Sequence, residues 1–580
     1  MPAGAPVIHG AGGDEPVTME SHRTTASGLL TWPARIVGAL SGLVAAIVAL
    51  GVTEMVAGMS RNWRSPVLDV GDRIVDNVPT FLKNFAIEQF GTNDKPILLL
   101  TIGAAVAVYA MVIGVLAFTK RLSFGLVGVA LFGVIGVYMA VSSRVGGSLD
   151  DAIPTLIGVT VGAGSLYVAH RLITPILSSH ADEAETTEES DANADAADAD
   201  PVDVRQEHPT DAPRASRRDL LVRSGGVLGV LAVAGGAAGG VGRVLRGRFS
   251  ATESRRLVSD GLPTALEPLA PIPDGVSVGV DGVSPFITPN ADFYRIDTAL
   301  TVPQVPTETY QLGVTGMVDN PLTLSFEDLI NRRVEEHDIT LTCVSNTVGG
   351  ELVGNARWLG VRLDELLDDA GVQRGATQVV GRSVDGYTCG FPIEAATDGR
   401  NALVAFGMNG EALPLEHGFP VRLIVPGLYG YISATKWLTE IELTTFEDFE
   451  SYWVPRGYAD RAPIKLMSRI DSVDGLGTLT TGDDGTAAIG GVAWAQTRGI
   501  SGVEVSIDGG DWQAAEMGDA LNDDTWRQWA FRFTPAGTDR TRTTITCRAI
   551  DGEGMIQTDD RAEPLPNGAS GQHNIVVFVE

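Results

Sequence analysis

The chain has 580 residues but is poor in lysine, with only five lysines among its 42 basic residues. Its formal net charge is −30, which excludes nucleic acid as the main partner because phosphate binding needs a basic surface. Strong acidity with arginine in place of lysine is typical of halophilic proteins, in which a large net charge maintains solubility. A GC-rich genome would also favour arginine over lysine, so both explanations stay open.

Cysteine and histidine are scarce as well, with three cysteines and eight histidines in the whole chain. Three cysteines are too few for a disulfide framework. No Cys-x-x-Cys-His motif for a c-type haem and no cysteine cluster for an iron–sulfur centre occurs. Only His170 lies near an apolar run, which excludes a bis-histidine haem within those runs.

Four apolar runs, each about as long as the roughly 20 residues that a spanning helix needs, predict a multi-pass protein of the cell membrane. They cover residues 36–57, 96–118, 122–142 and 153–169, within a four-helix transmembrane region at residues 1–175. Lys120 and Arg121 between the second and third runs indicate that this loop, and with it the N-terminus, is cytoplasmic.

Residues 176–215 contain a strongly acidic stretch without aromatic residues, which predicts a disordered linker. Residues 216–247 begin with Arg217 and Arg218 and continue as an apolar run rich in glycine and alanine. This segment is either an internal twin-arginine export signal or a fifth transmembrane helix. Both interpretations place the rest of the chain on the extracytoplasmic side.

The chain after about residue 250 has the pattern of an α+β protein. Residues 309–318 and 337–346 alternate as strands do, while 324–332 and 358–371 are amphipathic and predict helices. Ser325 three residues before Asp328 indicates a helix cap. Residues 466–580 are rich in short strands and tight turns, which predicts an immunoglobulin-like β-sandwich.

Cys343 ends an apolar strand and precedes a polar loop, where a thiolate could be a soft metal ligand or a nucleophile. It could equally be a small buried core residue. Neither histidine nor cysteine lies at zinc-like spacing from it. A cysteine protease would need His337 or His417 as its partner, and neither lies in a recognisable protease context.

Three segments in order, residues 341–367, 407–443 and 452–463, resemble the sulfite oxidase family of molybdopterin-dependent oxidoreductases. The resemblance implies a molybdopterin-binding catalytic domain at residues 275–465 and a molybdenum–molybdopterin cofactor. It also implies that residues 466–580 are a dimerisation domain, and hence a homodimer. The reaction implied is two-electron oxygen-atom transfer on a small substrate at the metal.

The resemblance also implies roles for individual residues. Cys343 matches the metal-ligating thiolate, and Tyr458 matches the active-site tyrosine. Further cofactor-binding positions match Asn290, Tyr294, Arg295, Ser383, His417, Arg422, Ser433, Ala434, Thr435 and Lys436, of which His417 and Arg422 correspond to the pair that contacts the pterin phosphate.

The substrate implied by the family is put in question by a departure from its pattern. In sulfite-oxidising members an Asn-Arg-Arg cluster follows the ligand cysteine, whereas here Cys343 is followed by Val344, Ser345, Asn346 and Thr347. Without those arginines a dianion lacks compensating charge. A sulfoxide-like substrate fits equally well. Arg357, Arg382 and Arg456 remain as possible sources of positive charge.

Electron exchange would require a separate electron-transfer protein or a quinone-linked carrier, because the chain has no recognisable haem or iron–sulfur motif of its own. A competing hypothesis makes the outer domain a non-catalytic binding module on a membrane bundle with a transport or docking role. The near absence of charged residues from the apolar runs disfavours a transport path through them.

Overall fold

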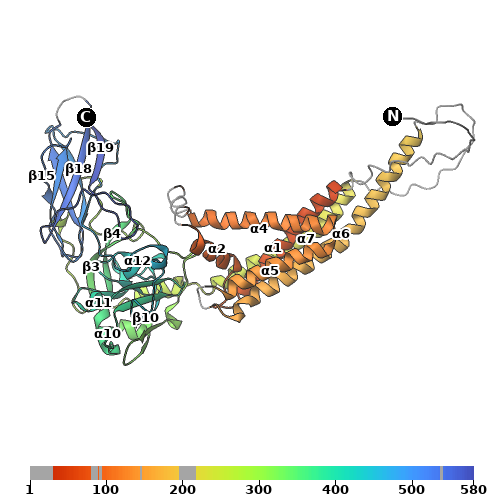
Figure 1. The fold of residues 1–580 in the computed structure, drawn as a ribbon, viewed down its shortest axis with the longest axis horizontal. Helices are drawn as coiled ribbons and strands as arrows, with labels where there is room; N and C mark the ends of the chain where they lie inside the picture. The colour runs from red at the N-terminus through yellow and green to blue at the C-terminus, as the bar shows by residue number, and fades with distance from the viewer. Residues whose placement is uncertain are drawn as a thin grey trace, which may run out of the picture. The chain divides into compact units, whose positions relative to one another are not determined.

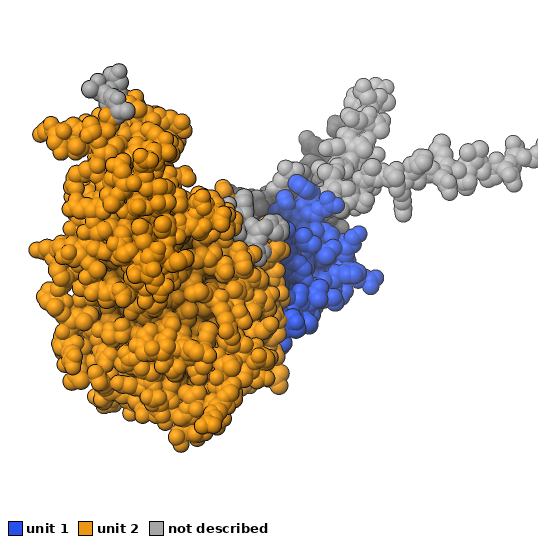
Figure 2. Space-filling model, turned by 60° about the vertical axis from the view of Figure 1, so that its left-hand side comes forward, with its two compact units in different colours: residues 1–59, 96–138, 152–243 blue, residues 60–95, 139–151, 244–580 orange. Residues whose placement is uncertain are grey.

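The computed structural model describes residues 31–79, 82, 89, 94–143, 147–194, 217–535 and 540–580. Two compact units divide the chain, and Figure 2 colours them separately. Unit 1 comprises residues 1–59, 96–138 and 152–243, and unit 2 comprises residues 60–95, 139–151 and 244–580. Unit 2 therefore includes two segments that connect helices of unit 1 as well as the whole α+β region.

Unit 1 is a bundle of long helices that run alongside one another (Figure 1). Its elements are α1 (Thr31–Ala57), α4 (Asp94–Thr119), α5 (Leu122–Val141), α6 (Ile153–Ala194) and α7 (Arg217–Gly247). Five helical segments of the described chain are long and apolar enough to cross a membrane. Three predicted spans lie within α1, α4 and α6, and the span 122–142 matches α5 except for its last residue. Residues 217–247 form the fifth helix.

The predicted disordered linker at residues 176–215 is wrong in its first part. Helix α6 continues through it as far as Ala194, and residues 195–216 lie outside the described residues. The sequence there is rich in alanine and glutamate, which have high helix propensity. Extending an existing helix also avoids the cost of nucleating a new one.

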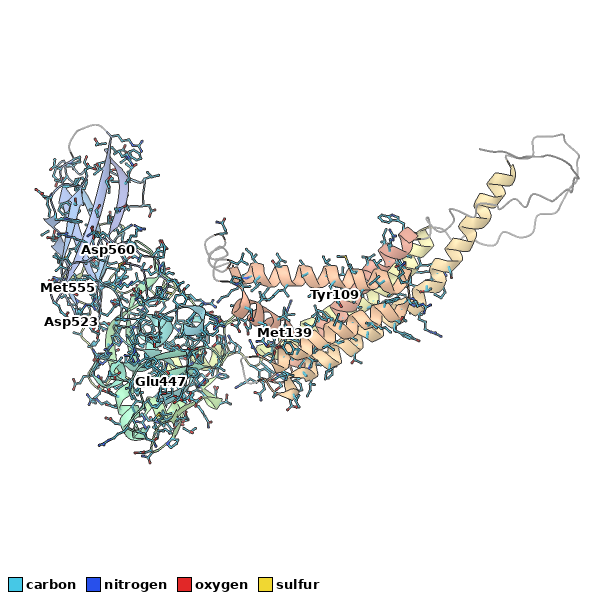
Figure 3. All side chains as sticks on the ribbon, in the orientation of Figure 1. Tyr109, Met139, Glu447, Asp523, Met555 and Asp560 are labelled. Carbon is cyan, nitrogen blue, oxygen red and sulfur yellow. The ribbon has the colours of Figure 1, made fainter. Side chains whose placement is uncertain are left out.

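Glycines allow the helices of unit 1 to approach closely. A Cβ atom on Gly42 of α1 would lie 1.9 Å from the carbonyl oxygen of Ala110 on α4, and one on Gly114 would lie 2.1 Å from that of Gly38. Small residues at helix contacts are typical of membrane bundles. Tyr109 of α4, labelled in Figure 3, donates a hydrogen bond of 2.8 Å to the carbonyl of Gly128 on α5.

Two sheets organise the first part of the α+β region in unit 2. One has the order β2-β1-β10-β5-β6, and the other has the order β3-β4-β7-β8 with β9 paired to β7. The strands are β1 (Gln311–Gly316), β2 (Leu322–Ser325), β3 (Glu335–Thr342), β4 (Val353–Arg362), β5 (Gln378–Ser383), β6 (Thr388–Pro392), β7 (Leu403–Met408), β8 (Glu411–Ala412), β9 (Arg422–Ile424) and β10 (Leu438–Thr444). The helices of unit 2 are α2 (Pro66–Asn77), α8 (Thr252–Asp260), α9 (Phe326–Ile330), α10 (Leu363–Ala370), α11 (Glu394–Thr397) and α12 (Gly430–Ser433).

The C-terminal part of unit 2 consists of two further sheets that share one hydrophobic core. Their orders are β11-β13-β17-β16 and β12-β19-β18-β14-β15. The strands are β11 (Met467–Ile470), β12 (Thr478–Leu479), β13 (Ala487–Trp494), β14 (Ile500–Ile507), β15 (Gln513–Ala514), β16 (Glu516–Met517), β17 (Arg527–Phe533), β18 (Thr541–Asp551) and β19 (His573–Val579). Inward-facing residues of both sheets, among them Val505 and Trp529, form that core.

Local sequence signals predicted several of these elements. Ser325 forms the expected capping box with Asp328 at the start of α9. The predicted helix at 358–371 is wrong in its first half, because Trp358–Arg362 belongs to β4 and only Leu363–Ala370 is helical. Strand β4 pairs with β3 and β7 on its two sides, so sheet pairing outweighs the amphipathic pattern there.

We expect Gly42→Val to destabilise the bundle, because the new side chain would overlap the main chain of α4. Overpacking of this kind costs about 1–3 kcal/mol. The measurement is the temperature at which detergent-solubilised protein loses its helical circular dichroism. Gly103→Val is the matched control, since a Cβ atom on Gly103 of α4 meets nothing within 4 Å. Equal transition temperatures for the two variants would contradict the packing of α1 against α4.

Candidate functional site

A cavity of about 110 Å³ lies in unit 2, where chain segments from both of its first two sheets meet. The cavity is lined by seven of the residues that the sequence singled out, namely Tyr294, Cys343, Ser383, His417, Arg422, Ala434 and Lys436. Cys343 directly follows β3, Ser383 ends β5 and Arg422 begins β9. Residues distant in the sequence are thus brought together because the strands that carry them converge.

Cys343 is buried, and its main-chain N–H donates a hydrogen bond of 2.9 Å to the carbonyl of Leu352 across the following loop. Burial raises the pKa of the Cys343 thiol, although hydrogen bonds from the main chain and side chain of Ser345 oppose this shift. The free thiol is therefore neutral at neutral pH. A bound metal would take it as the thiolate.

Ser345 also links the cysteine to Tyr458. The Tyr458 side chain forms a hydrogen bond with the Ser345 side chain, and its ring packs against Trp453 and Tyr431 at centroid distances of 5.3 and 5.5 Å. The sequence motifs assign no role to Ser345. The signal for it is a hydroxyl residue two positions after the candidate metal ligand.

His417 lies in a short 3-10 turn and is almost fully buried. Its Nε2 is 3.0 Å from the carbonyl oxygen of Asn290, which can only accept, so Nε2 carries the proton. Burial and the neighbouring Arg422 guanidinium lower the pKa of His417 to about 4. The ring is therefore neutral at neutral pH, and its Nδ1 is a hydrogen-bond acceptor.

Arg422 is a buried cation whose hydrogen bonds go to main-chain carbonyls. Its Nη1 donates to the carbonyl of His417 at 3.1 Å and its Nη2 to that of Ala434 at 3.5 Å, while Nε has no hydrogen-bond partner in the described chain. Burial lowers the pKa of Arg422 to about 10, so it stays charged at neutral pH. No carboxylate of the described residues forms a salt bridge with it. A buried cation of this kind attracts an anion.

Lys436 is the second buried cation of the cavity. Its Nζ lies 2.8 Å from Oδ2 of Asp297, a carboxylate that is only 3% exposed. Burial lowers the pKa of Lys436 to about 8, an effect that Asp297 opposes. Burial raises the pKa of Asp297, but Lys436 and Lys95 outweigh it and hold that pKa well below its usual range.

Four of the predicted cofactor-binding side chains do not line the cavity. The hydroxyls of Ser433 and Thr435 bond to main-chain carbonyls, and that of Thr435 also lies 2.7 Å from the sulfur of Cys389. The Asn290 amide donates a hydrogen bond of 2.6 Å to Glu411. Arg295 pairs with Asp297 at 2.9 Å at the edge of the cluster. The segments around these residues contribute Ala434, Lys436 and Tyr294 instead.

The cavity wall includes residues that the sequence analysis did not assign, such as Asp297, Asp385, Tyr387, Trp437 and Trp453. Asp297 lies two positions after Arg295 and three after Tyr294, to which the resemblance assigns cofactor binding, so only its position in the sequence indicated it. The aromatic residues carry no comparable signal in the sequence.

The three arginines considered as sources of positive charge for a substrate each face a carboxylate. Arg357 forms two hydrogen bonds with Asp338, at 2.9 and 2.8 Å. Arg382 pairs with Glu442, and Arg456 lies 3.7 Å from Asp76. None of the three lines the cavity.

The C-terminal sheets support the loop that follows Cys343. Arg469 of β11 donates a hydrogen bond of 2.7 Å to the carbonyl of Gly350. Gly349, with φ +81°, lies so close to the ring of His573 that a Cβ atom there would be 2.4 Å from Nε2. Nδ1 of the same ring accepts a hydrogen bond of 3.1 Å from the main-chain N–H of Ile470. The position of this loop therefore depends on both parts of the α+β region.

The sequence matches the model of a known family over residues 299–453, described as the oxidoreductase molybdopterin binding domain. The mitochondrial sulfite oxidase of Homo sapiens is 31% identical over 344 residues, which cover 51% of this chain and 62% of that protein. An uncharacterized oxidoreductase of Bacillus subtilis, YuiH, is 36% identical over 149 residues, which cover 26% of this chain and 72% of that protein.

The sulfane dehydrogenase SoxCD from Paracoccus pantotrophus is a similar solved structure, with 21% sequence identity and a TM-score of 0.43 over 56% of this chain and 92% of that one. The chain spans 62% of the length of the human sulfite oxidase that it matches. The apolar helices of unit 1 lie outside the residues matched by the family model.

We expect the stability of unit 2 to depend on pH through His573. Burial and the nearby Arg469 lower its pKa to about 4, below the value of about 6.5 in an unfolded chain. The folded state then binds fewer protons, so stability present above pH 6.5 is lost as the pH falls towards 4, by on the order of 3 kcal/mol for this group. Guanidinium unfolding of detergent-solubilised protein, followed by tryptophan fluorescence, measures it.

His573→Gln keeps an acceptor for the N–H of Ile470 but does not titrate, so its stability should fall less between pH 7.5 and 4 than that of the wild-type protein. The contribution of His417 is the same in both proteins and cancels in the comparison. Parallel pH profiles for the two proteins would contradict a neutral, buried His573.

Proposed function

Because the chain belongs to the sulfite oxidase family of molybdopterin-dependent oxidoreductases, we propose that it is a membrane-anchored enzyme of two-electron oxygen-atom transfer. One observation supports this most directly. A buried thiol, Cys343, and two buried cations, Arg422 and Lys436, line a single cavity within the α+β region of unit 2.

The residues of the cavity fit a molybdenum–molybdopterin cofactor. Arg422 has a buried Nε without a hydrogen-bond partner in the described chain, as expected of a guanidinium that is completed by an anionic group. Cys343 would hold the metal through its sulfur, and Arg422 with Lys436 would hold the phosphate of the pterin. The neutral His417 would accept a hydrogen bond at Nδ1. When bound, the cofactor supplies a centre that exchanges two electrons and an oxygen atom with the substrate.

Tyr458 and Ser345 would act on the substrate side of the metal ligand. Burial raises the pKa of Tyr458, so its hydroxyl keeps its proton at neutral pH and can donate a hydrogen bond to a substrate oxygen. Ser345 lies close enough to that hydroxyl to oppose the effect of burial on the pKa of Tyr458. We assign Tyr458 to orienting the oxygen atom that is transferred.

The charges around the cavity favour a substrate without net charge, such as a sulfoxide, over the sulfite dianion. Arg422 and Lys436 would be used by the phosphate of the cofactor, whereas Asp297 and Asp385 remain as carboxylates in the wall. Arg357, Arg382 and Arg456 each already face a carboxylate, as described above. A dianion would therefore enter without the compensating charge that burial requires.

Reduction of a sulfoxide breaks its S–O bond, consumes two electrons and two protons, and releases the oxygen as water. The electrons would come from a separate electron-transfer protein or a quinone-linked carrier, since the chain has no recognisable haem or iron–sulfur motif. A carrier dissolved in the membrane would suit an enzyme whose anchor contains five apolar helices.

We further propose that the α+β region faces the extracytoplasmic side. Lys120 and Arg121 favour a cytoplasmic loop between α4 and α5, and five crossings then place residues 244–580 outside. The connecting segments 60–95 and 139–151 would be on that same side, which agrees with their inclusion in unit 2. The two C-terminal sheets would form the immunoglobulin-like dimerisation domain of a homodimer.

We expect Cys343→Ser to abolish turnover while the pterin stays bound, because the phosphate-holding residues are unchanged and only the metal ligand is lost. Turnover, molybdenum content and released pterin would be measured on the purified membrane protein. Cys547→Ala is the control, since Cys547 lies in the core of the C-terminal sheets. Wild-type turnover in the serine variant would exclude Cys343 as the metal ligand, and wild-type protein free of molybdenum and pterin would refute the enzyme itself.

We expect the enzyme to reduce small sulfoxides with a reduced viologen dye more efficiently than it oxidises sulfite with ferricyanide, by about tenfold or more in kcat/KM. The reason is the missing positive charge for a dianion in the cavity. A preference of the wild-type protein for sulfite would contradict this assignment of the substrate.

A further inference from the structure

The segment that connects α1 and α4, residues 60–95, belongs to unit 2 and contacts the α+β region at several points. Near its start, Arg61 donates a hydrogen bond of 2.6 Å to the hydroxyl of Thr309. At the end of α2, Asp76 accepts a hydrogen bond of 2.5 Å from the hydroxyl of Tyr452. Tyr452 precedes Trp453, which lines the cavity. The segment therefore reaches the wall of the candidate site.

The third contact lies at the cation cluster of the cavity itself. Nζ of Lys95, at the start of α4, is 2.5 Å from Oδ1 of Asp297. The other carboxylate oxygen, Oδ2, faces Nζ of Lys436 at 2.8 Å and Nε of Arg295 at 2.9 Å. Asp297 is thus a buried carboxylate shared by three cations. One of them, Lys95, is 202 positions from Asp297 in the sequence.

This sharing decides how strongly Lys436 can bind an anion. A carboxylate that is neutralised by Lys436 alone would compete with any anion for that ammonium group, and it would also repel the anion directly. Lys95 approaches the opposite oxygen of Asp297 and supplies positive charge there. Asp297 can then stay ionised and hold Lys436 in position while Lys436 bonds to an incoming phosphate.

We infer that Lys95, the last residue of the segment 60–95 of unit 2, is a positioning residue for the cofactor phosphate that acts through Asp297 on Lys436. The inference rests on the proposed function, since the anion is the phosphate of the pterin. It means that the segment connecting α1 and α4 contributes a residue of unit 2 to the holding of the cofactor. Release of the cofactor then depends on Lys95.

The test is the rate at which pterin leaves the purified, cofactor-loaded, full-length protein after dilution, followed by the fluorescence of the released pterin. We expect Lys95→Met to release pterin about tenfold faster than the wild-type protein, which corresponds to about 1.4 kcal/mol. Lys95→Arg should restore slow release because it keeps the charge. Lys120→Met is the matched control, since Lys120 is exposed in the loop between α4 and α5.

A double-mutant cycle with Asp297→Asn tests the route of the effect. If Lys95 acts through Asp297, Lys95→Met should change the release rate less than twofold in the Asp297→Asn background. Lys95→Gln, which keeps a hydrogen-bond donor without the charge, replaces Lys95→Met if that variant does not fold.

The inference is overturned if Lys95→Met releases pterin at the wild-type rate, or if its effect is equally large with and without Asp297. Both outcomes leave the proposed function intact, because the wild-type protein still carries pterin. Wild-type protein that carries no pterin overturns the proposed function together with the inference. The release rate is measured without turnover, so a loss of catalysis alone cannot produce the expected result.

Discussion

The candidate site depends on the burial of a guanidinium that has no acidic partner among the described residues. Arg422 is held by the carbonyls of His417 and Ala434, and a charge buried in this way costs free energy that the fold must offset elsewhere. Together with burial, its positive charge lowers the pKa of His417, which is therefore neutral at neutral pH. Burial and the same charge also lower the pKa of Lys436. A bound anion would compensate the buried charge of Arg422 and oppose both pKa shifts, so the cavity has the character of an anion-binding site.

A second constraint is that the position of Cys343, the candidate metal ligand, depends on both parts of the α+β region. Cys343 directly follows β3, and the carbonyl of Thr340 in β3 accepts a hydrogen bond of 2.8 Å from Gln496 of the C-terminal part. Arg469 and His573 hold the loop that follows the cysteine. The C-terminal sheets therefore contribute to the geometry of the site, whether or not they also contribute to a dimer. A sulfur ligand needs this support because a small change in its direction alters the coordination of the metal.

Much of this could be predicted from the sequence because the informative residues lie in contiguous motifs. The sequence motifs assign a role to each of Cys343, His417, Arg422 and Lys436, and these four residues line one cavity. Ser433 and Thr435 belong to the same motif but turn towards main-chain carbonyls, because adjacent side chains in a short segment cannot all point the same way. Only the contacts in the folded chain decide which of them face the cavity.

Features that depend on long-range contacts could not be predicted from the sequence. The pattern at residues 358–362 is amphipathic, but β3 and β7 flank it in the fold and make it a strand. Lys95 and Asp297 are 202 positions apart, and no local signal connects a lysine at the start of an apolar helix with a carboxylate so distant in the sequence. Long-range ion pairs of this kind arise from tertiary structure alone, so the sequence could not predict the contact between Lys95 and Asp297.

The distribution of charge connects the habitat hypothesis with the choice of substrate. The chain has a net charge of −30, so an anionic substrate would approach against a repulsive field unless salt screened it. The positive charges that could reverse this field locally, Arg422 and Lys436, are buried and would be used by the cofactor. An uncharged substrate meets neither barrier: it is not repelled at the surface, and it does not need a cation in the cavity. The acidity of the exterior and the paired arginines around the cavity therefore favour the same class of substrate for independent reasons.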